Sequence, residues 1–242
     1  MTTIAGNLQQ VKERLWRACE GSSRDSAEVT LLAVSKTFGP DAVRQAHAAG
    51  QTAFGENYVQ EGVEKIALVA EALPRSAIEW HCIGPVQSNK TRLVAAQFDW
   101  VQSIDRLKIA QRLSEQRPAD LPPLNVCLQV NVDGGPNKAG VTPAELPALA
   151  DAVAALPGLR LRGLMCIPEP APDFEAQRAL FLRAREAYDD LRARGHALDT
   201  LSMGMSEDLE AAVAAGATMV RVGRAVFGAR EPKPAPVTSP VA

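Results

Sequence analysis

The sequence predicts one α/β domain folded as a (β/α)8 barrel of the TIM type, and three observations support this. Short β-rich runs alternate with longer runs of helical periodicity along the chain. Alternation of this kind is typical of a parallel sheet covered by helices. The chain has 242 residues, and one such barrel needs roughly 250. We therefore assign residues 1–230 to the barrel and expect the Pro-rich segment 231–242 to be disordered.

An extra amphipathic helix is expected before the barrel, ending near Gly21. Eight strands are expected after it, at 29–35, 52–55, 78–84, 99–104, 124–132, 159–167, 198–203 and 218–223. The connecting runs carry helix signals. Pro40 begins the first run and Gly50 ends it, and Thr142 opens a later run that closes before Pro157. Eight such β/α units favour a closed barrel over an open sheet.

Composition narrows the class of partner. The formal net charge is −2 and the basic residues are scattered, so the basic stripe of a nucleic-acid-binding protein is missing. No run approaches the roughly 18 apolar residues of a membrane span, and the N-terminal run has no apolar signal core. The four cysteines form no CxxC pair, which argues against a zinc site and a disulfide framework. We expect a cytoplasmic monomer that binds a small molecule.

Lys36 follows the first predicted strand and should lie at the C-terminal mouth of the barrel, where the chemistry of such folds collects. A lysine after a strand buried on both faces is partly desolvated, which favours the neutral amine. A neutral amine can attack an aldehyde. The alternative is that Lys36 reaches out to water or pairs with Glu56, and position alone favours this ordinary interpretation.

The loops after the seventh and eighth strands resemble the pair that often holds a phosphate in these barrels. In SMGMSEDLE, Gly204 permits a tight turn and Ser206 is predicted to cap the next helix. In RVGRAVFG, Gly223 allows backbone N–H groups to approach an anion, and Gly228 ends the following turn. Each of these residues alone is better explained by a structural role. Because both loops have suitable residues, an anion site and a purely structural role are about equally well supported.

Arg221 lies two residues before Gly223, so strand alternation turns both toward the same side. A buried arginine needs a partner, which is either a carboxylate or the ring nitrogen of a cofactor. Because guanidinium keeps its protons, it would leave that nitrogen unprotonated and weaken the ring as an electron sink.

Other candidates have ordinary structural alternatives. His81 lies within a strand, where a lone histidine is more often a satisfied core group. Asn57 either binds a ligand or caps the next helix. Met165 and Met203 either fill the core or wall a pocket.

Six runs of this sequence together resemble a known family: AVSKT, FGENYVQE, WHCIGPVQSNK, GLMCIP, LSMGMSEDLEAAVAAG and MVRVGRAVFGAR. The family is that of the pyridoxal phosphate homeostasis proteins, also called alanine racemase N-terminal domain-like PLP-binding proteins. The resemblance covers roughly residues 5–230, nearly the whole chain. The combination of motifs is specific, although no single motif is.

The resemblance implies a fold-type III barrel that holds pyridoxal 5'-phosphate (PLP) covalently, as an internal aldimine on Lys36. It implies that Asn57 and His81 lie beside the cofactor and that Arg221 faces the pyridine nitrogen. Arg224 replaces a residue that is commonly Ser or Thr, so a guanidinium contact to phosphate is expected in place of a hydroxyl contact. The implied phosphate site consists of Ser202, Met203, Ser206, Gly223 and Arg224.

The role implied by the resemblance is non-enzymatic. Such a protein binds PLP, buffers it and hands it over, and so affects vitamin B6 and amino-acid pools. The implied recipients are apo forms of PLP-dependent enzymes.

Two other functions stay open on the sequence alone. A PLP-dependent amino-acid racemase shares this kind of barrel but needs a second base opposite the lysine. Such racemases take a tyrosine from an additional β-domain, and this chain has only Tyr58 and Tyr188, both placed in or beside helices. A phosphosugar-binding barrel enzyme could instead use Lys36 to form a Schiff base with its substrate.

Overall fold

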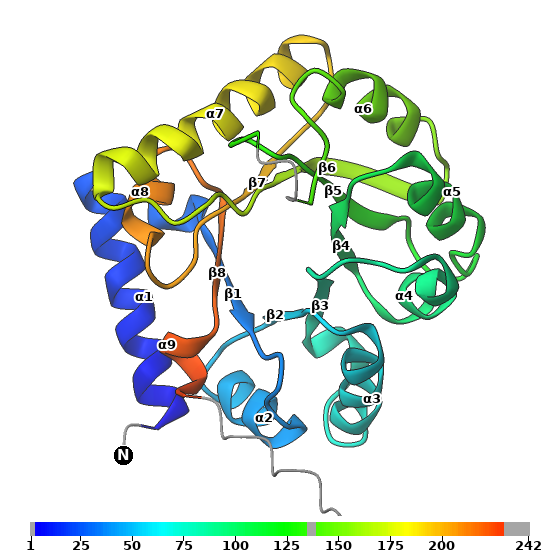
Figure 1. The fold of residues 1–242 in the computed structure, drawn as a ribbon. Helices are drawn as coiled ribbons and strands as arrows, with labels where there is room; N and C mark the ends of the chain where they lie inside the picture. Colours follow the sequence, from blue (N-terminus) through cyan, green and yellow to red (C-terminus); the bar gives the residue numbers. More distant parts are fainter. Residues whose placement is uncertain (1–2, 135–138, 230–242) are drawn as a thin grey trace, which may run out of the picture.

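The computed structural model describes residues 3–134 and 139–229 of the chain. The Pro-rich segment 231–242, expected to be disordered, lies outside the described residues. Eight parallel strands form a closed barrel in which each strand pairs with the next in sequence and the last pairs with the first. Figure 1 shows this ring of strands enclosed by helices. The fold prediction is confirmed.

The strands follow the predicted order. They are β1 (Thr30–Val34), β2 (Ala53–Glu56), β3 (Glu79–Cys82), β4 (Trp100–Ile104), β5 (Leu124–Gln129), β6 (Leu159–Met165), β7 (Thr200–Ser202) and β8 (Met219–Val222). The prediction carried β3, β5 and β6 two or three residues too far at their C-terminal ends. The apolar run continues there because residues such as Ile83, Val132 and Cys166 are buried in the loops that form the mouth, outside the sheet.

The α-helices lie between and around the strands. They are α1 (Ile4–Gly21), α2 (Pro40–Ala48), α3 (Val59–Ala70), α4 (Thr91–Gln97), α5 (Leu107–Glu115), α6 (Leu146–Ala154), α7 (Phe174–Ala193), α8 (Leu209–Ala214) and α9 (Arg224–Phe227). Short 3-10 turns occur at Ser26–Glu28, Arg75–Ala77 and Ser88–Lys90. Within the described ranges, no helix is long and apolar enough to cross a membrane.

Both faces of the sheet are buried, which explains why its strands are nearly continuous apolar runs. One set of alternate side chains fills the barrel interior in two clusters: Leu32, Val34, Ala53, Ile83 and Met219 form one, and Trp100, Cys127 and Met165 form the other. The opposite set, which includes Phe54 and Leu128, belongs to the large core between strands and helices. This alternation decides which residues near the strand ends can reach the mouth.

Helix α1 packs on the outside of the barrel, against other helices. Thr3 caps it by accepting a hydrogen bond from the Gly6 amide, and the helix ends at Gly21 as predicted. Its apolar face, which includes Leu8 and Leu15, is buried. Figure 1 shows α1 running alongside α8 and α9, so the first helix packs on the last two.

Candidate functional site

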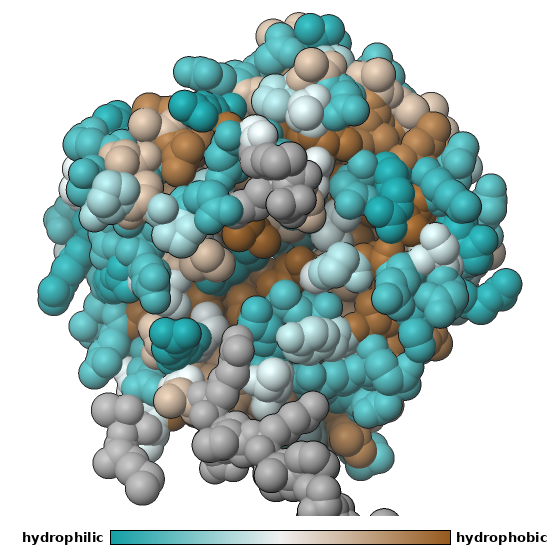
Figure 2. Space-filling model, viewed as in Figure 1, coloured by the Kyte–Doolittle hydropathy of each residue, from teal (hydrophilic) through white to brown (hydrophobic). Residues whose placement is uncertain are grey.

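Lys36 lies in the turn directly after β1 and is half-buried. Val34 points into the barrel interior, and the Ser35 hydroxyl bonds to Glu56 on the helix side. Alternation counted on from Val34 would place Lys36 on the interior side of the mouth, which stays a prediction because Lys36 lies in a turn outside the strand. Figure 2 shows a depression near the centre of the ring of strands, with apolar residues at its bottom.

The two neighbours of Lys36 are held by a buried ionic cluster beside α3. Lys65 donates to the Ser35 carbonyl (2.7 Å) and to Glu56 Oε1 (2.6 Å). The Thr37 amide donates to Glu61 Oε1 (2.5 Å), and Thr37 adopts a positive φ of 70°. A non-glycine residue in this region of backbone space is costly and needs such support. The backbone that carries Lys36 is therefore fixed on both sides.

Glu56, considered above as a partner for Lys36, forms its ion pair with Lys65. It also accepts the Ser35 hydroxyl at 2.6 Å. Burial raises the pKa of Glu56, although Lys65 and Ser35 act in the opposite direction. Its second oxygen, Oε2, is buried without a hydrogen-bond partner in the described structure.

Arg221 points into the barrel interior and is 4% exposed. Its Nη1 donates to Ser202 Oγ (2.8 Å) and its Nη2 donates to the Cys166 carbonyl (2.9 Å). Burial lowers the pKa of Arg221 from its ordinary value. Among the described residues it forms no ion pair, so the carboxylate partner that we considered is not seen there.

His81 is fully buried on β3, one residue before the C-terminal end of the strand. Its Nε2 lies 2.8 Å from Glu79 Oε1 and its Nδ1 lies 2.9 Å from Gln102 Nε2. The ring stacks on Trp100, with centroids 5.0 Å apart. Because both ring nitrogens are engaged inside the protein, this geometry does not favour a direct hydrogen bond from His81 to a cofactor.

Sequence reasoning missed Gln102, which is fully buried on β4. Its Oε1 accepts the Ser202 hydroxyl at 2.6 Å, and its Nε2 contacts His81. A signal was available, because Gln102 is a polar residue in the middle of the apolar run WVQSI. A buried amide in such a position requires partners on the facing strands.

The loop after β7 turns at Gly204, as predicted, with a φ of 90°. A Cβ on Gly204 would lie 2.4 Å from Ala212 Cβ, so only glycine fits. The prediction that Ser206 caps the next helix is wrong: α8 begins at Leu209 with Asp208 at the N-cap. Asp208 accepts a hydrogen bond from the Met205 amide instead, which leaves Ser206 within the loop.

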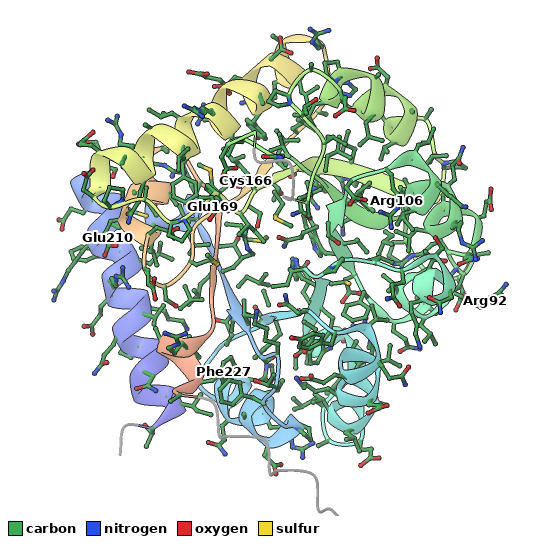
Figure 3. All side chains as sticks on the ribbon, in the orientation of Figure 1. Arg92, Arg106, Cys166, Glu169, Glu210 and Phe227 are labelled. Carbon is green, nitrogen blue, oxygen red and sulfur yellow. The ribbon has the colours of Figure 1, made fainter. Side chains whose placement is uncertain are left out.

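The loop after β8 passes close to the end of β1. A Cβ on Gly223 would lie 3.1 Å from the Val34 carbonyl oxygen. Gly228 ends the short helix α9 with a φ of 90°, as predicted. Phe227 of α9, labelled in Figure 3, stacks on Phe38 with ring centroids 5.1 Å apart. The segment after Lys36 and the loop after β8 therefore pack together.

Arg224 begins α9, and its side chain is 79% exposed. Its Nη1 lies 3.9 Å from Glu207 Oε1 in the loop after β7. This pair brings the two predicted phosphate loops side by side, although such an exposed contact adds little stability.

Three other predicted site residues, Met165, Ser202 and Met203, do not all lie on the same side of the sheet. Met165 points into the interior beside Trp100. Ser202 also points inward, but its hydroxyl is bound by Arg221 and Gln102. Met203 packs in the core between strands and helices. The Met203 side chain therefore does not line the barrel interior, and only its backbone could contact a ligand at the mouth.

Asn57 follows β2 at the mouth. Its side-chain Oδ1 is buried and has no hydrogen-bond partner in the part of the chain that the structure describes. The cap of α3 is Tyr58, without a side-chain cap bond, so the capping role considered for Asn57 is not observed. A buried acceptor without a partner after β2, the strand that pairs with β1, is a candidate for a ligand's donor.

In residues 3–134 and 139–229, no group of three His, Cys, Asp or Glu side chains is arranged to hold a metal ion. All four cysteines are free, as expected from their spacing, and all four are buried. Burial raises the pKa of Cys166, labelled in Figure 3 on the segment that follows β6, to about 12.

A closed barrel with a lysine after β1 and glycine turns after β7 and β8 is found in a known class of proteins. Residues 4–231 match the family model described as alanine racemase, N-terminal domain. A solved alanine racemase from Corynebacterium glutamicum has the same fold, with a TM-score of 0.68 at 20% identity; the match covers 98% of this chain and 62% of that one.

Nearer relatives narrow the class. The chain is 61% identical to the pyridoxal phosphate homeostasis protein of Pseudomonas aeruginosa over 96% of its own length and 97% of the relative. It is 54% identical to the Escherichia coli K12 protein of the same name, covering 96% and 98% of the two chains. The chain belongs to the pyridoxal phosphate homeostasis protein family.

Solved structures agree with this assignment. PipY of Synechococcus elongatus PCC7942 is known without PLP, with a TM-score of 0.82 and 38% identity, and with PLP bound, with a TM-score of 0.80 and 37% identity. Each match covers 93% of this chain and 100% of PipY.

Proposed function

We propose that this chain binds PLP at the C-terminal mouth of the barrel, attached covalently to Lys36, and acts as a carrier in vitamin B6 homeostasis. The observation that carries the proposal is the meeting of the fixed Lys36 turn with the paired loops after β7 and β8. The chain's relatives named for PLP homeostasis and the PLP-bound PipY support the choice of cofactor.

The residues at the mouth fit PLP. Asn57 offers a buried acceptor without a partner in the described residues. Gly223 begins the loop after β8 next to the end of β1, and its lack of a side chain favours close approach of a phosphate to the backbone N–H groups of that loop. Met165 supplies an apolar wall for the ring.

Each residue has a separate task in this proposal. Lys36 forms the bond to the aldehyde carbon, with loss of water. Asn57 bonds to a donor on the cofactor. The phosphate is held at the two loops by the backbone at Met203, by Ser206, Gly223 and Arg224, and the exposed Arg224 must swing inward to contact it. Ser202 and His81, whose polar atoms are engaged inside the barrel, act through their neighbours.

Arg221 is assigned to the pyridine nitrogen. When bound, PLP supplies an aldehyde and an electron-withdrawing ring. A guanidinium facing the nitrogen keeps that nitrogen unprotonated and so weakens the ring as an electron sink. The relatives of this chain are named for PLP homeostasis, which favours storage and release over turnover. We therefore propose a non-enzymatic role, in the cytoplasm and as a monomer, with apo PLP-dependent enzymes as recipients and effects on amino-acid pools.

The test is to replace Lys36 with Ala, load the protein with PLP, and record its visible absorption and its mass after borohydride reduction. We expect wild type to trap one pyridoxyl group per chain and Lys36→Ala to trap none. Lys108→Ala, at an exposed position on α5, is the control and should behave as wild type. Equal trapping by wild type and Lys36→Ala would overturn the assignment.

A further inference from the structure

A continuous chain of hydrogen bonds crosses the barrel interior beneath the mouth. It runs from Glu79 to His81 (2.8 Å), from His81 to Gln102 (2.9 Å) and from Gln102 to Ser202 (2.6 Å). It continues from Ser202 to Arg221 (2.8 Å) and ends at the Cys166 carbonyl (2.9 Å). Four of the linked side chains are at most 4% exposed, so water does not compete for these bonds.

Arg221 sets the direction of every bond in this chain, because guanidinium can only donate. Ser202 Oγ accepts from Arg221, so its own hydrogen is free to go to Gln102 Oε1. The amide NH2 of Gln102 then faces His81 Nδ1 and donates to it. His81 is thereby the tautomer that carries its proton on Nε2 and donates to Glu79.

The far end of the chain is held firmly. The His81 ring stacks on Trp100 with an interplanar angle of 14°, and Arg162 lies over the same indole at 4.6 Å from its centroid. Gln102 has a further contact from its Nε2 to Met219 Sδ at 3.1 Å. Gln102 therefore has little freedom to turn its amide, and its Oε1 stays aimed at Ser202.

We infer that Gln102 is a positioning residue: through Ser202 it fixes the Arg221 guanidinium, and His81 and Glu79 hold Gln102 in place. This rests on the proposed function, in which Arg221 faces the cofactor ring nitrogen. It adds that the electronic state of the bound cofactor depends on a residue of β4 that does not touch it. Without Gln102, the Ser202 hydroxyl turns to another acceptor and the guanidinium loses its fixed orientation.

The test uses Gln102→Met, which keeps the length of the side chain and removes both its donor and its acceptor. We expect the variant to bind PLP roughly tenfold more weakly, because a guanidinium without a fixed orientation makes a weaker hydrogen bond to the ring nitrogen. Its visible band should also change shape with pH across the neutral range, because a loosely held Arg221 no longer prevents protonation of the ring nitrogen. Wild type should keep one band shape.

Gln51→Met is the matched control. Gln51 is 4% exposed and donates to two backbone carbonyls, those of Leu31 and Ala53, away from this chain of bonds. It should lower thermal stability without altering the spectrum. A Gln102→Met protein with the spectrum and affinity of wild type, or a Gln51→Met protein with the same spectral change, would overturn the inference.

A measurement on the apo-protein separates this inference from the proposed function. If the chain is one unit, the losses of thermal stability in Gln102→Met and Ser202→Ala are not additive in the double variant. Additive losses count against the inference whether or not PLP binds. Should Gln102→Met not fold, Ser202→Ala carries the spectral test, because it removes the same link to Arg221. Failure of the proposed function would appear instead as wild type that binds no PLP.

Discussion

At the scale of single residues, Gly84 decides how closely two loops meet at the mouth. An added Cβ there would lie 2.0 Å from the carbonyl oxygen of Asn57. The backbone after β2 and the backbone after β3 are therefore in direct contact, and a methyl group cannot be inserted without moving Asn57. Glycine is required here by close approach and not by an unusual φ.

We expect Gly84→Ala to destabilise the fold by about 1–3 kcal/mol, as overpacking of a backbone contact does. PLP affinity should fall as well, because the displaced Asn57 carries the unpartnered acceptor. The measurements are thermal unfolding and PLP titration. Gly39→Ala is the control, since a Cβ at Gly39 meets nothing within 4 Å. Equal behaviour of the two variants would contradict this role for Gly84.

Residues differed in how well the sequence predicted them. The turns at Gly204 and Gly228 followed from local chemistry. Ser206 was misassigned because α8 begins only at Leu209, with Asp208 in the N-cap position and the Asp208 side chain bonded back to the Met205 amide. Lys65 and Gln102 were missed because their partners lie on other strands or loops, and one sequence does not show which polar residues meet across a barrel.

At the scale of elements, α1 supports the loop after β7 from outside the barrel. Arg14 donates to both oxygens of Glu210 on α8 at 2.6 Å, and its third nitrogen donates to the Ser206 carbonyl at 2.6 Å. Figure 3 labels Glu210 on the face of α8 nearest α1. One side chain of the N-terminal helix thus ties α8 to a proposed phosphate loop.

This pair predicts a pH-dependent contribution to stability. The hydrogen bond from Arg14 lowers the pKa of Glu210. Because the folded pKa lies below the unfolded value of about 4.3, the stabilisation is complete above that value and is lost as pH falls through the folded pKa. We expect Glu210→Gln to cost about 1 kcal/mol at neutral pH, roughly 2–4 °C in Tm, for this partly exposed pair.

Thermal unfolding of both proteins across a pH series checks the sign. The difference in Tm between wild type and Glu210→Gln should shrink as the pH drops below about 4. Glu175→Gln is the control, since that carboxylate is 77% exposed and 3.6 Å from Arg178. A difference that grows in acid would refute the assignment.

At the scale of the whole molecule, the barrel shares its fold with alanine racemases, and the placement of its two tyrosines bears on whether it has a second base. Tyr188 is buried in α7 and donates to the Leu198 carbonyl at 2.9 Å. Tyr58 is 58% exposed at the start of α3. These are the two tyrosines of the chain. Inside the barrel, Ser202, Gln102 and His81 form the hydrogen-bonded chain that ends at Arg221. The relatives described above are not named as phosphosugar enzymes.

We therefore expect a carrier and not a racemase. The PLP-loaded protein should leave the optical rotation of L-alanine and L-serine unchanged, and it should activate an apo PLP-dependent enzyme while free PLP is trapped. An alanine racemase and free PLP are the positive controls for the two assays. Racemisation that disappears in Tyr58→Phe would contradict the carrier role and identify Tyr58 as the base.

The packing of α1 on α8 and α9 also has a consequence for the order in which the barrel forms. Residues 7 and 24 and strand β1 find their partners 189 or more residues later: Asn7 donates to the Val226 carbonyl, Arg24 donates to that of Val213, and β1 pairs with β8. Contacts of such long sequence separation form only after a large loop has closed. We therefore expect β1 to lack its β8 neighbour, and the loops after β1 and β8 to stay apart, until the C-terminal part of the barrel has formed.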